Sequence, residues 1–200
     1  MNLFSRCFFF IFLFSFILSC SPEEKKTFPV DSRTLKSITV KSLDGKISSV
    51  SDLISRHRAT VFYFLMPGCP MCESYTLAIN ELDKKFSGKE ISFFGIFSSD
   101  YYSDEEIISF RNDFEIQIPF YRDIDFKLTR SLGATVTPEV FVMDSTATIL
   151  YSGSIDNWAY ATGKIRMEAT EFFLNDALEN IMGGKPVALK STKAYGCFIE

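Results

Sequence analysis

Residues 59–72 read ATVFYFLMPGCPMC. Residues 59–65 are mostly β-branched or aromatic, which is typical of a strand buried on both faces of a sheet. The Pro-Gly pair that follows ends this strand, and apolar side chains then recur at helical spacing from Pro70 to Phe86. The stretch therefore predicts a buried strand that leads directly into a helix, with two cysteines at the junction.

Cys69 and Cys72 lie three residues apart, at the first turn of the predicted helix. The unpaired N–H groups and the dipole of a helix N-terminus stabilise a thiolate, which lowers a cysteine pKa from about 8.5 to roughly 3.5–7.5. The spacing also brings the second sulfur onto the same face of the helix as the first. We therefore predict that Cys69 is an exposed nucleophile and that Cys72 resolves a mixed disulfide.

A Cys-x-x-Cys pair also provides half of a zinc site. A Cys3His set can be composed from Cys69, Cys72, Cys197 and His57. Against zinc, the pair follows a buried strand, and the sequence has no second Cys-x-x-Cys and no Cys-x-x-His. A redox dithiol is the favoured interpretation, with a zinc site and an inert structural disulfide as alternatives.

Strand-like and helix-like segments alternate along the rest of the chain. Strands are predicted at 37–40, 91–97, 139–143 and 148–151, and helices at 51–58, 103–114, 126–132 and 169–182. This order predicts an α/β fold with a central mixed sheet flanked by helices. A chain of 200 residues has room for one domain of the usual size, and its net charge of −4 argues against a nucleic-acid partner.

The N-terminus is predicted to be an export signal. Residues 7–18 are apolar except for one serine, and this length suits a signal-peptide core of about 7–15 residues better than a spanning helix of about 20. The sequence Ile-Leu-Ser-Cys that ends at Cys20 resembles the cleavage site of a bacterial lipoprotein. We expect residues 1–19 to be removed, Cys20 to carry lipid, and residues 20–33 to form a linker. The chain would then be anchored to a membrane of the cell envelope and face the periplasm or the exterior.

Cys197 is the third thiol of the predicted exported chain, so it has no partner if Cys69 and Cys72 pair with each other. Export would place it outside the reducing cytosol, where disulfides persist. It lies in residues 183–200, which we expect to be a tail with few local constraints. Two outcomes are open. Cys197 forms a disulfide with Cys69 or with a second chain, or it packs against the domain without a redox role.

The strand-PGCPMC-helix segment, together with GATVTPEVFVMD at residues 133–144, resembles the thioredoxin-like superfamily. Within it, the sequence is similar to the redoxin branch, which includes proteins related to alkyl hydroperoxide reductase and thiol-specific antioxidant proteins. The resemblance covers residues 34–182 and implies a thioredoxin-like fold. It also implies that Pro138 is cis and faces the dithiol, and that Thr137 presents its backbone to the substrate.

Two departures from the family refine this reading. Peroxidase members carry a threonine three residues before the reactive cysteine, whereas Met66 precedes Cys69 by three positions. Thioredoxins bury an aspartate six residues before the first cysteine, and this position is Tyr63 here. Water, Glu73 or Glu139 would then have to accept the proton of the second thiol, and Asp156 is a further acidic residue expected to border the site or to cap a turn.

The sequence as a whole predicts a membrane-tethered thiol-disulfide oxidoreductase that uses Cys69 and Cys72, with Thr137 and Pro138 shaping the docking groove. It needs no dissociable cofactor, because the electrons reside in the dithiol. Its expected partners are protein or small-molecule thiols and disulfides, and a membrane reached through Cys20. The alternatives are a thiol peroxidase, with Cys72 or Cys197 resolving, and a non-enzymatic metal-binding lipoprotein.

Overall fold

The computed structural model describes residues 31–86 and 88–200. The predicted signal peptide and the predicted lipidation site at Cys20 therefore lie outside the described residues, as does most of the predicted linker. Residues 32 and 33, which the sequence assigned to the linker, belong to a helix because Asp31 accepts hydrogen bonds from the backbone N–H groups of Arg33 and Thr34. In the described part of the chain, no helix is long and apolar enough to cross a membrane.

A mixed sheet of seven strands forms the centre of the molecule, in the order β2-β1-β5-β4-β3-β7-β8. Strands β3, β4 and β5 are parallel, and the remaining pairs are antiparallel. The strands of this sheet are β1 (Thr39–Ser42), β2 (Ile47–Ser49), β3 (Ala59–Phe64), β4 (Ile91–Phe97), β5 (Phe120–Arg122), β7 (Glu139–Met143) and β8 (Ile149–Gly153). The predicted α/β fold with a mixed sheet is confirmed.

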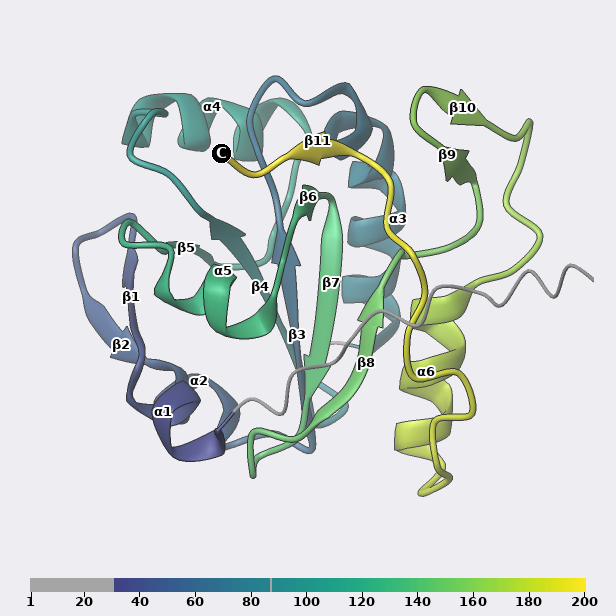
Figure 1. Cartoon of the computed structure of the whole chain (residues 1–200), viewed down its shortest axis with the longest axis horizontal. Helices are drawn as coiled ribbons and strands as arrows, with labels where there is room; N and C mark the ends of the chain where they lie inside the picture. The colour runs from purple at the N-terminus through teal and green to yellow at the C-terminus, as the bar shows by residue number, and fades with distance from the viewer. Residues whose placement is uncertain (1–30, 87) are drawn as a thin grey trace, which may run out of the picture.

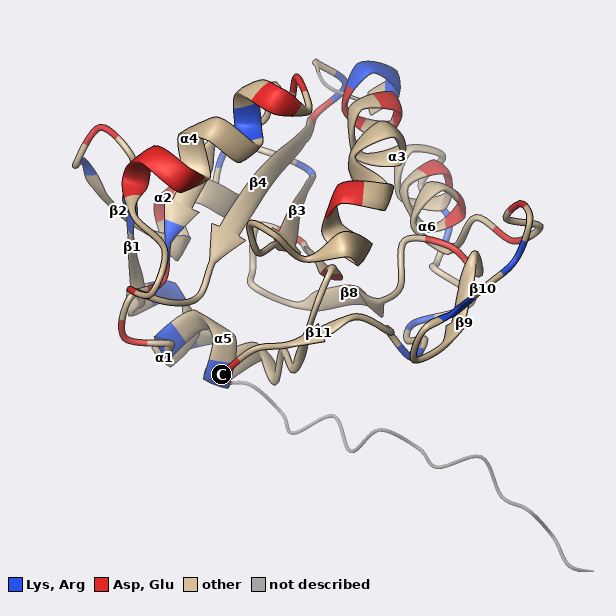
Figure 2. Cartoon of the chain, turned by 90° about the horizontal axis from the view of Figure 1, so that it is seen from above, with Lys and Arg blue, Asp and Glu red and all other residues tan. Residues whose placement is uncertain are grey.

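Helices cover both faces of this sheet, so the core has two layers (Figures 1 and 2). Val61 and Tyr63 of β3 pack with α3, α4 and α6, whereas Phe62 and Phe64 point to the opposite face and pack with α1, α2 and α5. This alternation explains why every residue of β3 is apolar or β-branched. The helices are α1 (Ser32–Ser37), α2 (Val50–Ile54), α3 (Pro70–Phe86), α4 (Asp104–Asp113), α5 (Lys127–Leu132) and α6 (Phe173–Met182).

The helix boundaries match those predicted from the sequence where the capping residues are neighbours in the chain. The capping box at α4 forms as the sequence predicts, with Ser103 and Glu106 each accepting from the other's backbone N–H. Helix α6 was predicted from residue 169 but begins at Phe173. The reason is a distant side chain, because Asn157 Oδ1 accepts hydrogen bonds from the backbone of Thr170 and Glu171 and holds them outside the helix.

The C-terminal segment is fixed to the domain, so the prediction of a tail with few constraints is wrong. Residues 190–192 run beside β8, where Ser152 donates its N–H to Lys190 and its carbonyl accepts from Thr192 at 3.0 Å. The chain then reaches β11 (Cys197–Phe198), which pairs antiparallel with the short strand β6 (Val136–Thr137), as the yellow strand in Figure 1 shows. The remaining strands, β9 (Ala159–Ala161) and β10 (Lys164–Ile165), form a separate hairpin.

Candidate active site

Cys69 lies at the junction between β3 and α3, as the sequence predicts. Its carbonyl accepts the N–H of Glu73 at 3.0 Å, so that Cys69 ends the loop and opens the helix, whose first residue is Pro70. Gly68 precedes it with a φ of 70°, a left-handed conformation that glycine adopts without strain. The loop therefore directs the Cys69 side chain toward the end of the sheet where β6 and β11 lie.

The disulfide of the structure joins Cys69 to Cys197, with their Cα atoms 6.2 Å apart. Cys72 is a free, fully buried thiol. The oxidised pair predicted from the sequence, Cys69 with Cys72, is therefore not the pair found here, and the alternative in which Cys197 bonds to Cys69 is the one observed. Cys69 is only 2% exposed, not an open nucleophile as expected, and its sulfur is bonded to Cys197 of β11.

Thr137 and Pro138 border this disulfide. The peptide bond between them is cis, as the family resemblance implies. The Thr137 carbonyl oxygen lies 3.4 Å from Cys69 Sγ, and the Thr137 hydroxyl donates a hydrogen bond of 3.5 Å to the carbonyl of Cys197. Thr137 thus contacts both halves of the disulfide, and its backbone forms part of the ladder with β11.

Burial controls the acidity of Cys72. The apolar surroundings raise the pKa of this thiol to about 12, although hydrogen bonds with Thr137 and with the backbone of Met66 act in the opposite direction. The negative charge of Glu73 raises the pKa of Cys72 further. Cys72 is consequently a protonated thiol at neutral pH and is a poor first nucleophile.

We expect Cys72 of the folded, oxidised chain to react with iodoacetamide about a thousandfold more slowly at pH 8 than a thiol of pKa near 9, because each pKa unit changes the thiolate fraction tenfold. Burial disfavours the charged form, so the rate should rise as the pH approaches 12. Mass spectrometry of the labelled peptides over a pH series measures this rate. The unfolded chain is the control, and labelling of native Cys72 at the unfolded rate would contradict the prediction.

Tyr63 occupies the position of the proton-accepting aspartate of thioredoxins and cannot replace it. Its side chain is fully buried, and among the described residues its hydroxyl has no hydrogen-bond partner. Burial raises the pKa of Tyr63 far above its usual value, so the phenol remains neutral. Tyr63 instead fills the core, where its ring stacks on Phe93.

The three acidic residues considered from the sequence have different surroundings, and Glu73, in the first turn of α3, is partly exposed. Glu139 is fully buried beside Pro138, and its Oε2 accepts the N–H of Thr135 at 2.9 Å. Asp156 is also buried, and its Oδ1 accepts from the Tyr75 hydroxyl at 2.7 Å and from the N–H of Trp158 at 2.8 Å. Asp156 therefore braces helix α3 one turn beyond Cys72, a tertiary contact that the sequence did not predict.

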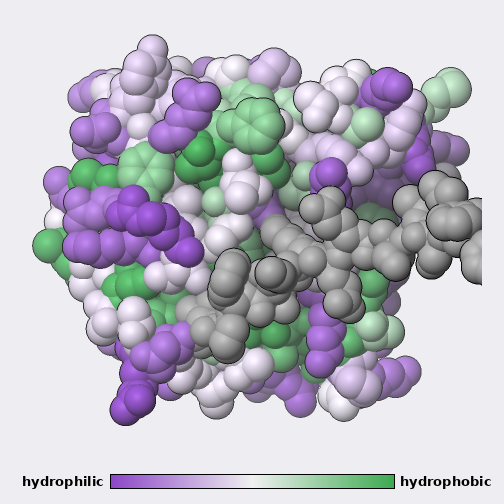
Figure 3. Space-filling view, viewed as in Figure 1, coloured by the Kyte–Doolittle hydropathy of each residue, from purple (hydrophilic) through white to green (hydrophobic). Residues whose placement is uncertain are grey.

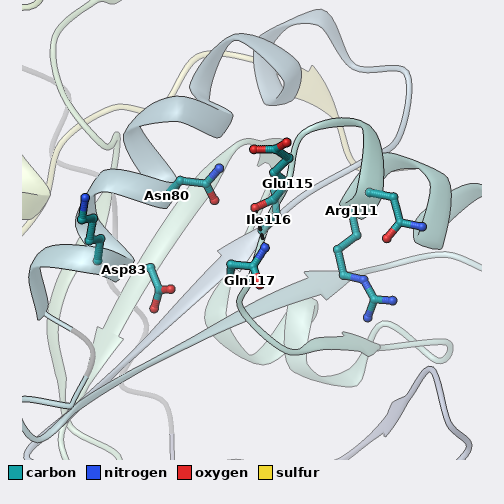
Figure 4. Close-up of a pocket in the computed structure, with 8 residues that line it drawn as sticks. Asn80, Asp83, Arg111, Glu115, Ile116 and Gln117 are labelled. Atoms are coloured by element: carbon teal, nitrogen blue, oxygen red, sulfur yellow. Dashed lines mark hydrogen bonds between the residues drawn. The ribbon is translucent and has the colours of Figure 1, made fainter.

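Other parts of the described chain offer less chemistry. Over residues 31–86 and 88–200, no three His, Cys, Asp or Glu side chains are grouped so that they could hold a metal ion. A pocket of about 970 Å³ lies between α3 and the end of α4, and Figure 4 shows Asn80 and Asp83 opposite Arg111 across it. The residues that line this pocket are Asn80, Asp83, Lys84, Arg111, Asn112, Glu115, Ile116 and Gln117, and none of the three cysteines of the site is among them.

Comparison with known proteins supports the fold and the family. A family model described as Redoxin matches residues 27–158. A hypothetical protein of Sinorhizobium meliloti shares the fold with a TM-score of 0.71 and 20% identity, over 81% of this chain and 89% of that one. No curated protein matches the sequence.

Two solved structures with described activities also share the fold. A secreted disulfide oxidoreductase of Mycobacterium tuberculosis, homologous to Escherichia coli DsbE, has a TM-score of 0.52 and 16% identity, over 77% of this chain and 98% of that one. Peroxiredoxin Q of Xanthomonas campestris has a TM-score of 0.51 and 16% identity, over 60% and 81% of the two chains. At this level of identity, the likeness establishes a thioredoxin-like fold.

Proposed function

This chain belongs to the redoxin family, and from that premise we propose that it is a thiol-disulfide oxidoreductase in which Cys69 exchanges with the substrate. The observation that carries the proposal is the disulfide of Cys69 itself. This sulfur lies at the start of α3, against Thr137, and is already engaged by a second cysteine that approaches along β6. The arrangement can therefore hold a mixed disulfide with an extended chain.

The reaction proceeds by two thiol exchanges. The Cys69 thiolate attacks one sulfur of the substrate disulfide, forms a mixed disulfide and releases the other sulfur as a thiolate that takes up a proton. A second thiol of the chain then attacks Cys69, releases the second substrate thiol and leaves an intramolecular disulfide. Substrate disulfide is reduced and the chain is oxidised by two electrons. Cys197 is the second thiol whose bond to Cys69 is observed, and Cys72, one turn along α3, is the other candidate.

A thiol peroxidase is the second candidate, because the Cys69–Cys197 bond is also the product expected of such a reaction. There the Cys69 thiolate attacks the O–O bond of a peroxide, and a sulfenic acid forms as water or an alcohol leaves. Cys197 condenses with the sulfenic acid and releases water. Met66, which stands where peroxidases carry threonine, weighs against this candidate.

Turnover assays on the purified chain separate the two candidates. With a dithiol as the electron donor, we expect the chain to catalyse the reduction of a model protein disulfide. We expect it not to accelerate the consumption of hydrogen peroxide. The control for the peroxide assay is the same donor with a protein that has no thiols. Rapid peroxide turnover without disulfide turnover would favour the peroxidase instead.

We also propose that the chain is tethered to a membrane of the cell envelope through lipid on Cys20. The support is the sequence alone, namely the apolar segment 7–18, the small residue Ser19 before the cysteine, and the polar residues that follow. Incorporation of a labelled fatty acid in bacterial cells, and its loss in Cys20→Ser, is the expected result. Equal labelling of both chains would contradict the anchor.

A further inference from the structure

The C-terminal strand approaches Cys69 in the manner of an extended peptide added to a sheet edge. Cys197 pairs with Thr137 and Phe198 with Val136, and the N–H of Ile199 donates to the carbonyl of Thr135 at 3.1 Å. These contacts are made by backbone atoms, which any extended segment can supply. The Phe198 side chain is 69% exposed and adds little to the contact. On this face, hydrophobic residues gather over β6 and β11, with hydrophilic residues around them (Figure 3).

Gly196, directly before the cysteine, is the point at which side-chain identity matters. A Cβ atom there would overlap the carbonyl oxygen of Thr137 and lie 2.6 Å from its carbonyl carbon and 3.2 Å from Pro138 N. These are backbone atoms of a buried segment, which cannot move aside as a flexible side chain would. In this register, the residue before the cysteine must therefore be glycine.

The segment also closes the site to other partners. While β11 is in place, Cys69 is 2% exposed, and the edge of β6 has its hydrogen bonds with β11. The segment is held upstream, because Ser154 Oγ donates to the Lys193 carbonyl at 2.6 Å and Tyr151 hydroxyl lies 2.7 Å from Thr192 Oγ1. Only a few residues separate this attachment from Cys197. After reduction, the segment can leave Cys69 yet remain nearby at high effective concentration.

From these contacts, and resting on the proposed function, we propose that residues 195–199 occupy the substrate position of Cys69 as a tethered substrate mimic. We further infer that the edge of β6 accepts extended polypeptides in which glycine directly precedes the reactive cysteine. The substrate class is thus a protein disulfide in an extended segment, and the oxidised chain is closed to it. A dithiol opens the site in two steps. Its first thiolate attacks the Cys69–Cys197 bond and forms a mixed disulfide with one of the two cysteines. Its second thiol then attacks that mixed disulfide, so that the donor leaves as a disulfide and both cysteines become thiols.

A peptide experiment tests the glycine requirement directly. The probes are two peptides, Ala-Tyr-Gly-Cys-Phe-Ile, which copies residues 194–199, and the same peptide with alanine before the cysteine. In each peptide the cysteine is joined by a disulfide to the same aromatic thiol, which is the leaving group. The release of this aromatic thiol is measured with the reduced Cys197→Ser chain, in which the C-terminal segment cannot form a disulfide with Cys69. We expect the glycine peptide to modify Cys69 at least about tenfold faster, because the alanine Cβ meets fixed backbone. Equal rates at Cys69 would overturn the proposal.

The same requirement is tested within the chain by Gly196→Ala. The matched control is Gly183→Ala, at the start of the same C-terminal segment, where the backbone has a φ of −75° and the nearest atom to an added Cβ is the Glu179 carbonyl oxygen at 3.3 Å. After mild oxidation, we expect the Cys69–Cys197 crosslink to drop at least tenfold in Gly196→Ala and to persist in the control. An undiminished crosslink in Gly196→Ala would overturn the proposal. If the chain reduces the model disulfide but the two peptides react at equal rates, this inference alone fails. If the chain neither reduces the model disulfide nor reacts with either peptide, the proposed function fails as well.

Discussion

Replacing Cys69 with serine is expected to lower the rate of protein-disulfide reduction by at least about a thousandfold, because a serine hydroxyl forms no mixed disulfide and the covalent route is lost. Neither remaining thiol can take its place. Burial raises the pKa of Cys72 to about 12, which keeps it protonated, and Cys197 lies on the strand that would have to leave before a substrate docks. The measurement is the initial rate of dithiol-driven reduction of the model disulfide.

Cys72→Ser is the matched control for that experiment. Like Cys69→Ser, it replaces one sulfur atom by oxygen, here in a buried thiol, but it leaves Cys69 and the start of α3 in place. We expect this variant to release the aromatic thiol of the probe peptide through Cys69 and then to form the Cys69–Cys197 bond, neither of which Cys69→Ser can do. A Cys69→Ser chain that retains more than about a tenth of the wild-type rate would exclude Cys69 as the nucleophile.

Replacing Cys197 with serine is expected to destabilise the oxidised chain strongly. The bond joins residues separated by 128 positions, and the loop-entropy relation for a loop of this size gives a loss of up to about 5 kcal/mol in the free energy of unfolding. For a chain of this length, that corresponds to a fall of roughly 10–20 °C in Tm. A new bond between Cys69 and Cys72 would close only a very short loop and would restore little of this stability.

The stability prediction is measured by thermal and denaturant unfolding of wild type and Cys197→Ser. Oxidised samples should differ, and the two chains should unfold nearly together once a reductant has cleaved the bond. If their oxidised unfolding curves coincide, the Cys69–Cys197 bond does not form in solution. Non-reducing gels and peptide mapping of the same samples identify which cysteines are paired.

Several elements could be predicted from sequence because their causes are local. Strand β4 and helix α3 have the bounds expected from hydrophobic periodicity, since a repeat of two or 3.6 residues is set by neighbouring side chains. The capping box at Ser103 likewise closes within three residues. The start of α6 was misplaced because Asn157, from another part of the chain, binds residues 170 and 171. Periodicity carries no information about such a contact.

The features of the candidate site also fall into two groups, those with local causes and those set by contacts between distant segments. Sequence alone determined that Cys69 opens a helix after a buried strand, that Cys72 follows one turn later, and that Thr137-Pro138 precedes another strand, because each statement concerns residues adjacent in the chain. Only the tertiary structure decided which cysteine bonds to Cys69. That choice depends on β11 pairing with β6, on the space that Gly196 leaves beside Thr137, and on the path of residues 190–193 along β8. These contacts join segments that are far apart in sequence, and their geometry exists only after the sheet has assembled and brought the chain's end back to the first turn of α3.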